Sequence, residues 1–177
     1  FAEKDGAKST TITTNFYKID PNLSITLETE YANQYNAGGN DALIDGIIGA
    51  EDFRTGTWQG YWNEDLIATV DLGSEKPIET ISVNFLQNQG SWIFYPTEVV
   101  CFVSKNGKDF KLIDIYKIDT TIPSEKAEIK KVSFNQKTAS YRYVKIVAKK
   151  LGKLPEWHLG FEHDGRSWLF VDEIIIN

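Results

Sequence analysis

Hydrophobic and polar residues alternate along the chain in short stretches, which is the pattern of half-buried β-strands. Leu23, Ile25 and Leu27 alternate with polar residues and so turn one face of a strand toward a core. The same alternation, or an apolar run of strand length, recurs along the rest of the chain. We expect strands at 11–17, 66–72, 78–86, 92–103, 110–116, 127–134, 141–148 and 168–176.

Turn residues separate these stretches. Asn106 and Gly107 give the strongest hairpin signal and predict a type I′ turn leading into the strand at 110–116. Gly73 is expected to end the strand at 66–72, and Pro96 predicts two strands or one bulged strand within 92–103. A turn at 41–44 is the longest helical signal. Strands of this length joined by turns predict an all-β fold, a two-sheet antiparallel β-sandwich.

The pattern divides the chain into an extension and one domain. Residues 1–20 are polar and weakly patterned, as in a linker or N-terminal extension, and 21–177 form the predicted sandwich domain. Residues 149–167 are the longest stretch without a strand signature. A loop of that length in a compact domain is usually functional or disordered. Because this loop holds Trp157 and both histidines, an ordered functional loop is the better interpretation.

Composition excludes some partners and leaves others open. Hydrophobic residues at 41% and charged residues at 25% are ordinary, but aromatic residues reach 13%, with five tryptophans. Such an excess indicates a large core, a stacking surface, or both. The net charge of −6 argues against nucleic acid, which needs a basic surface. The cluster of Lys149, Lys150 and Lys153 is interpreted as a solvated strand end.

The single cysteine, Cys101, lies in an apolar run and is expected to be a buried small side chain rather than a nucleophile. No disulfide can form within the chain, which fits both a cytosolic protein and an exported bacterial domain that does without disulfides. No apolar run approaches the roughly 18 residues of a membrane helix. The chain begins with Phe1 and contains no methionine, so we expect a processed chain or a piece of a larger protein.

Six landmarks in order resemble the discoidin, or factor 5/8 type C, family over residues 22–177. They are ALIDG (42–46), Trp58, VDLG (70–73), VSKNGKDF (103–110), YRYVKI (141–146) and VDEI (171–174). The resemblance implies a discoidin-like jelly roll, used in bacteria mostly as a family 32 carbohydrate-binding module. The segments at 58–61 and 91–96 are similar to a narrower group, in which the domain is appended to β-hexosaminidases (chitobiases).

A cation site is the first candidate. Asp45 stands in a glycine-containing turn whose carbonyls can curl inward, and Ca²⁺ takes roughly six to eight oxygen ligands. The resemblance implies a structural calcium that ties this turn to the last strand. The implied ligands are Ala42, Asp45, Thr55 or Thr57, Asp172 through its carbonyl, and Glu173. The loop before Trp58 is longer than in many relatives, so Asp52 competes with the two threonines. In the alternative, Asp45 caps a turn and Glu173 pairs with a lysine.

A sugar site is the second candidate. A pyranose ring needs an exposed aromatic plane with polar groups at its edge. The candidates are Tyr35, Trp62, Gln87, Trp92, Trp157 and His158. Trp62 matches the loops that carry the site in the family. The family often supplies an arginine and an asparagine where this chain has Gln87, Asn88 and Gln89, so galactose recognition does not carry over. Trp58 and Trp168 are expected in the core, and Trp157 either at the site or against a neighbouring domain.

Catalysis is not expected. An acid/base set can be assembled from Asp71, Glu156, His158, Glu162, His163 and Asp164. All but Asp71 lie on one loop, and no second rigid element opposes them, whereas a glycosidase needs two carboxylates at a defined separation. No nucleophile-elbow, zinc-protease or phosphate-loop motif occurs in the sequence.

Together these features predict a calcium-stabilised, non-catalytic carbohydrate-binding accessory domain of a bacterial glycoside hydrolase, in a secreted, periplasmic or cell-surface location. A terminal N-acetylhexosamine or galactose-type sugar is the expected ligand, on the strength of the family. The main alternative is a structural domain whose loop 154–161 docks against the parent catalytic domain without binding sugar. A weaker one is a discoidin-type adhesion domain for proteins or lipids, which the acidic balance disfavours.

Overall fold

The computed structural model of the chain describes residues 3–9, 20–120 and 122–177. Its domain strands are β3 (Ser24–Leu27), β4 (Gln59–Trp62), β5 (Leu66–Gln87), β6 (Glu98–Ser104), β7 (Lys111–Lys117), β8 (Glu128–Lys149) and β9 (Trp168–Ile176). Its 3₁₀ turns are η1 (Asn33–Tyr35), η2 (Asn40–Leu43), η3 (Phe53–Thr55) and η4 (Gln89–Ser91). Among the described residues, no helix is long and apolar enough to cross a membrane. The strand predicted at 11–17 lies outside the described residues.

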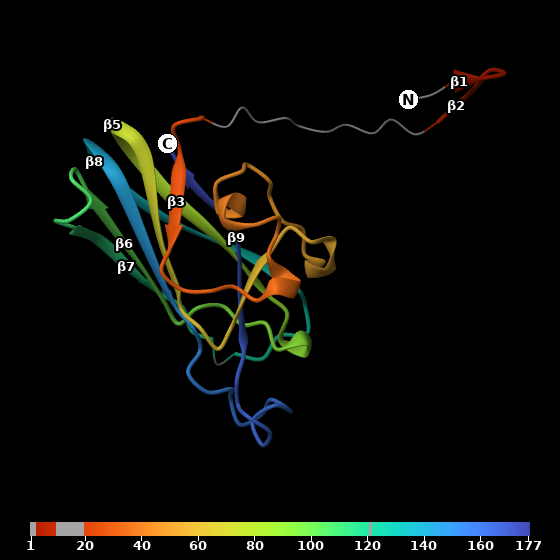
Figure 1. Cartoon of the computed structure of the whole chain (residues 1–177). Helices are drawn as coiled ribbons and strands as arrows, with labels where there is room; N and C mark the ends of the chain where they lie inside the picture. The colour runs from red at the N-terminus through yellow and green to blue at the C-terminus, as the bar shows by residue number, and fades with distance from the viewer. Residues whose placement is uncertain (1–2, 10–19, 121) are drawn as a thin grey trace.

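Two long bent strands join two layers into a β-sandwich (Figure 1). The first part of β5 pairs with β3 and with the end of β8, which continues to β6 and β7. The second part of β5 pairs with the start of β8 and with β9, which continues to β4. All of these pairings are antiparallel, so the predicted all-β antiparallel sandwich is confirmed.

The continuity of β5 and β8 was not predicted. The stretches 66–72 and 78–86 are one strand, and so are 127–134 and 141–148. The prediction that Gly73 ends a strand is wrong, because the chain bulges there and continues: Gly73 has a φ of 76° and its N–H donates to Asp71 Oδ1 at 2.8 Å. The register shift after Asp71 bends the strand from one layer into the other, as bulges do.

The segment 92–103 contains one regular strand, which is preceded by residues of irregular conformation. Only β6 is regular, and before it Ile93 forms isolated bridges to Asn88 and Trp168. Trp92 has a φ of 61°, which a strand cannot contain. The segment therefore turns at Trp92 and touches β9 before it enters the first layer.

The hairpin between β6 and β7 is confirmed, but its type I′ turn is not. A type I′ turn needs positive φ at both central residues, and only Gly107 has it, at 71°. Instead, Asn106 Oδ1 accepts the N–H groups of Lys108 and Asp109, each at 2.9 Å. The asparagine side chain thus organises a longer loop by replacing a backbone acceptor.

The N-terminal extension contains a hairpin that its polar composition did not indicate. Strands β1 (Glu3–Lys4) and β2 (Ala7–Lys8) pair with each other in antiparallel register. The turn residues Asp5 and Gly6 have φ of 51° and 79°, and Asp-Gly is a favoured pair for that geometry.

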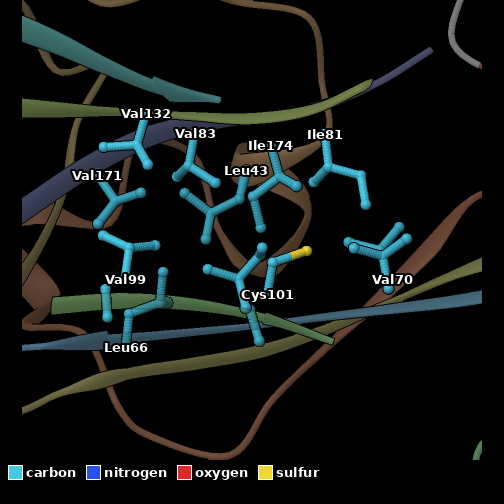
Figure 2. Close-up of a cluster of buried hydrophobic side chains, with 14 of the residues drawn as sticks. Leu43, Leu66, Val70, Ile81, Val83, Val99, Cys101, Val132, Val171 and Ile174 are labelled. Atoms are coloured by element: carbon cyan, nitrogen blue, oxygen red, sulfur yellow. The ribbon is translucent and has the colours of Figure 1, made fainter. Parts of the chain in front are cut away.

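The core lies between the layers (Figure 2). Val83, Val132, Val171 and Ile174 project from one layer toward Leu66, Val99 and Cys101 of the other, and all are buried. Leu43, carried by η2, fills the space between them. Cys101 is a buried core residue as predicted, and burial raises the pKa of its thiol to about 12, so it remains a thiol at neutral pH.

Candidate functional site

Two carboxylates of β9 hold the loop that follows η2. The N–H of Gly46 donates to Glu173 Oε1 at 3.2 Å, and the N–H of Gly49 donates to Asp172 Oδ2 at 2.5 Å. Asp45 lies between η2 and Gly46 in the sequence, and its Oδ1 accepts the N–H of Ile47 at 2.8 Å. These hydrogen bonds connect the 42–49 loop to the last strand, β9.

A β-bulge explains why neighbouring residues of one strand serve the same loop. Val83 pairs with Ile174 and Phe85 with Val171, so Asp172 and Glu173 together oppose the single residue Asn84. In a regular strand consecutive side chains point to opposite faces, and a bulge re-aims one of them. The bulge thus presents both carboxylates to the loop, which the alternation of the sequence does not indicate.

The carboxylates are not neutralised by the residues around them. Asp172 is fully buried and Glu173 is only 5% exposed, and within the described structure Asp172 Oδ1 and Glu173 Oε2 have no hydrogen-bond partner. Burial, and then the charges of Asp45 and Asp172, raise the pKa of Glu173 to about 8. Burial also raises the pKa of Asp172 and of Asp45. A buried acidic group of this kind requires a proton or a cation.

The fit to a calcium ion is therefore partial. Two orphaned carboxylate oxygens suit a hard cation, yet among the described residues no three Asp, Glu, His or Cys side chains form a metal centre by themselves. Main-chain carbonyls would have to complete the set. The predicted ligands Thr55 and Thr57 bond to each other at 3.1 Å, and Thr55 also to the carbonyl of Asp52. Asp52 itself pairs with Arg54 at 2.7 Å, which argues against it as a ligand.

Trp58 fixes the back of the same loop. Its indole Nε1–H donates to the carbonyl of Ala50 at 2.8 Å, and its ring is 1% exposed. The ring packs so closely on Gly49 that a Cβ there would overlap it. Trp58 is thus the core residue that was predicted, and it also supports the carboxylate-bound loop.

Three of the predicted sugar-binding residues meet in a cleft of about 610 Å³, here called the aromatic cleft. Its side chains are Gln89, Trp92, Glu125, Trp157, His158 and Leu159. Pro123 and Ser124 form one wall. Trp157 is 43% exposed and Leu159 82%, so the long 149–167 loop presents apolar planes at the surface, as its composition indicated.

His158 is the fixed polar group of the aromatic cleft. Its Nδ1 accepts the N–H of Gly160 at 3.0 Å, which leaves Nε2 to donate to the carbonyl of Gln89 at 2.9 Å. The imidazole stands edge-on to Trp92 and Trp157, with ring centres 5.0 and 5.7 Å away. Both nitrogens are occupied, so His158 orients the indoles and is not available as a general base.

Gln89 is the residue that sequence analysis missed. Its side chain is buried and bridges to the opposite wall: Nε2 donates to the carbonyl of Ile122 at 2.9 Å, and Oε1 accepts the N–H of Ser124 at 2.6 Å. The signal was present in the polar run at 87–89, where Gln87 was chosen instead. Gln89 thus binds the Pro123–Ser124 wall through its side chain and binds His158 through its main-chain carbonyl.

Tyr35 and Trp62 do not join the aromatic cleft. Tyr35 packs on Trp168 and Phe170, with ring centres 5.1 and 4.8 Å away, and Trp62 lies 4.8 Å from Trp168. These rings extend the small core around Trp58. Trp168, predicted to be in the core, is half-buried between them.

Gln87 lies in a different cleft of about 480 Å³, here called the lateral cleft. Its side chains include Gln87, Tyr95, Tyr116, Lys117, Glu128 and Lys130, and it shares the Pro123–Ser124 wall with the aromatic cleft. The structure thus distributes the six predicted sugar-binding residues over three places.

The acid/base candidates are also dispersed. Asp71 is engaged by Arg142 at 2.8 Å, and that hydrogen-bonded pair lowers the pKa of its carboxyl. Glu156, Glu162, His163 and Asp164 are exposed on one loop.

Comparison with known proteins identifies the family. The model of the F5/8 type C domain matches residues 24–173. The chain belongs to the F5/8 type C family. The match spans every strand from β3 to most of β9, so it covers both the loop bound by Asp172 and Glu173 and the aromatic cleft. No match to a curated protein sequence was found.

Solved structures of the F5/8 type C fold are similar to the chain. The Clostridium perfringens module CpGH89CBM32-5, in complex with GalNAc-β-1,3-galactose, is 21% identical, with 88% of this chain and 94% of that one covered and a TM-score of 0.54. The C-terminal domain of a Bacteroides fragilis chitobiase is 18% identical, with coverages of 90% and 95% and a TM-score of 0.56. The family 32 module of C. perfringens NanJ, in complex with galactose, is 16% identical, with coverages of 88% and 93% and a TM-score of 0.53. At these identities the likeness shows the fold, which is that of carbohydrate-binding modules.

Proposed function

We propose that the chain is a non-catalytic carbohydrate-binding domain that acts beside a bacterial glycoside hydrolase, outside the cytoplasm. The observation that carries the proposal is the aromatic cleft, where Trp92 and Trp157 flank a fixed imidazole at an open surface. An indole plane packs against the C–H face of a pyranose, and Glu125 supplies a polar group at its edge. Modules of the same fold bind galactose and GalNAc-β-1,3-galactose, which supports a terminal N-acetylhexosamine or galactose-type ligand.

Such a domain works by raising the local concentration of substrate near its partner. Linking a weak binding site to a catalytic domain turns the second encounter into an intramolecular one. The aromatic cleft is shallow and offers few fixed polar groups, so we expect an affinity from roughly millimolar to tens of micromolar, about −4 to −6 kcal/mol. The domain itself would carry out no hydrolysis.

A structural calcium is part of the proposal. The side chains of Asp45 and Glu173 would hold it, together with the main-chain carbonyls of Asp172 and of the 42–49 loop. Asp172 and Glu173 each use one carboxylate oxygen for that loop and, within the described structure, have the other without a hydrogen-bond partner. The ion would supply the positive charge that the buried carboxylates lack. The residues of this chain already position the loop through Gly46, Gly49 and Trp58.

A second function is favoured by the apolar rim of the same cleft. Leu159 is 82% exposed and Trp157 43%, and clustered exposed apolar side chains are typical of protein contacts. In this alternative the rim packs against the parent catalytic domain, and no sugar enters.

One titration separates the two functions. Galactose, N-acetylgalactosamine and N-acetylglucosamine are titrated to tens of millimolar while the indole N–H signals are followed by NMR. Shifts of the Trp92 and Trp157 signals that disappear in Trp157→Ala, but persist in Leu159→Ser, support sugar binding. If no indole signal moves with any sugar, while Leu159→Ser weakens association with the parent catalytic domain, the docking function is the correct one.

A further inference from the structure

We propose that the lateral cleft is a second sugar subsite, so that the domain recognises two linked sugars that cross the Pro123–Ser124 wall. This inference rests on the proposed function and deepens it. The terminal sugar would occupy the aromatic cleft, and the next one would enter the lateral cleft.

The main evidence is a buried amide without a partner. Gln87 is 6% exposed, and its side chain makes no hydrogen bond with the described residues. Its neighbour Leu86 packs in the small core with Trp58 and Phe170, so Gln87 projects to the other face of β5, where it lines the lateral cleft. Its amide atoms reach the space of the lateral cleft, since the described buried side-chain polar atoms that lack a partner belong to Asp172 and Glu173. The two donors and the acceptor of the Gln87 amide are therefore available to a ligand in that cleft.

The surrounding groups suit a neutral, hydroxyl-rich ligand. Tyr95 donates its hydroxyl to the carbonyl of Glu128 at 2.9 Å, and Lys130 Nζ lies 5.4 Å from the centre of its ring. Lys117 and Lys130 form no ion pair with the described residues, and they line the same cleft as the carboxylates of Asp119 and Glu128. Mixed donors and acceptors without a net charge match sugar hydroxyls better than an anion. The ring of Tyr116, which is half exposed, offers a plane for stacking.

The two clefts adjoin and are held in register. Pro123 and Ser124 line both of them. The Gln89 side chain fixes this wall through the N–H of Ser124 and the carbonyl of Ile122, at 2.6 and 2.9 Å. Because these hydrogen bonds hold the wall in place without a ligand, binding of a two-sugar ligand costs less conformational entropy of the protein. A single sugar can occupy only one side of the wall.

The test is the dependence of affinity on chain length. Dissociation constants are measured by calorimetry for N-acetylgalactosamine against GalNAc-β-1,3-galactose, and for N-acetylglucosamine against its β-1,4-linked dimer and trimer. We expect at least one two-sugar ligand to bind about tenfold more tightly than its terminal sugar. The Gln87 side-chain amide signal should shift with that ligand alone. Gln87→Leu should abolish the gain and leave the single-sugar constant unchanged, whereas Gln34→Leu, at an exposed glutamine outside both clefts, should change neither.

The outcomes separate this inference from the proposed function. If single sugars bind at Trp157 but no longer ligand gains affinity or moves the Gln87 amide, the second subsite is wrong and the proposed function stands. If no sugar moves the indole signals, both are wrong. Should Gln87→Leu lower the melting temperature enough to obscure the comparison, Tyr116→Ala on exposed β7 decides instead: loss of the chain-length gain supports the subsite, and an unchanged gain overturns it.

Discussion

Removing divalent cations should make the stability of the domain fall as the pH rises, and calcium should abolish that fall. The pKa of Glu173 is about 8 in the folded chain, against 4.5 for an ordinary glutamate. Between these values the folded state keeps a proton that the unfolded state releases, so the free energy of unfolding decreases with rising pH. The stabilisation is complete below about pH 4.5 and is lost as the pH passes about 8. The raised pKa of Asp172, also caused by burial, acts in the same direction.

The structure sets the size of the effect. The interval from 4.5 to about 8 corresponds to a ceiling of about 5 kcal/mol, at roughly 1.4 kcal/mol for each pH unit. Water that enters the loop at high pH would lower this figure, so we expect a loss of about 2–5 kcal/mol. For a domain of this size the melting temperature should then drop by about 5–15 °C. Bound calcium would keep both carboxylates ionised and paired, and would stabilise the native state by mass action.

The assay is thermal unfolding followed by circular dichroism from pH 5 to pH 8, in chelator and in millimolar calcium, with elemental analysis of the purified protein. Glu173→Gln removes the titrating group and should flatten the profile in chelator while reducing the response to calcium. Glu162→Gln, on the exposed loop, is the matched control and should behave as the parent does. A flat profile for the chelated parent, or an unchanged slope in Glu173→Gln, would refute the reasoning.

Three further predictions concern packing around the two sites. Gly49→Ala should destabilise the domain by about 1–3 kcal/mol in chemical denaturation, because the added methyl overlaps the Trp58 ring; Gly152→Ala, where a Cβ meets open space, should change stability by less than about 0.5 kcal/mol. Trp58→Phe should lower the free energy of unfolding by about 1–3 kcal/mol, since the carbonyl of Ala50 loses its indole donor; an unchanged denaturation midpoint would contradict this. Gly160→Ala should weaken sugar binding and perturb the Trp92 indole signal, because a Cβ there overlaps that ring; a parent-like spectrum would show that the cleft tolerates the change.

The sequence indicates the fold well because burial on one face of a sheet imposes a period of two. That period locates β3 and the paired parts of β5 and β8. It does not show whether two such stretches are one strand, since Gly73 can end a strand or bulge it. Nor does it distinguish a type I′ turn from the loop organised by the Asn106 side chain, because both need an asparagine followed by glycine.

The candidate site was predictable in its parts and not in its grouping. Trp157 and His158 could be predicted as site residues because aromatic side chains in a long loop indicate a binding or packing surface. Whether Gln87 or Gln89 reaches them depends on the chain reversal at η4, which places the two glutamines in different clefts. No periodicity encodes that reversal. The separation of Tyr35 from the cleft has the same origin, because ring contacts between distant segments decide which aromatic residues remain exposed.

The many aromatic residues have two roles, as core rings packed on β9 and as exposed rings of the aromatic cleft, and β9 contacts both groups. Trp168 and Phe170 give this strand an aromatic side on which Tyr35 packs, and the bulge at Asp172 and Glu173 then directs charge into the 42–49 loop. The backbone of the same strand also holds the cleft, since the N–H of Trp168 donates to the carbonyl of Trp92 at 2.8 Å. Rings buried against β9 therefore make it rigid, and a rigid β9 allows Trp92 to remain half-exposed in a fixed orientation. If the aromatic cleft binds a sugar as proposed, that fixed orientation would contribute affinity by reducing the entropy lost on binding.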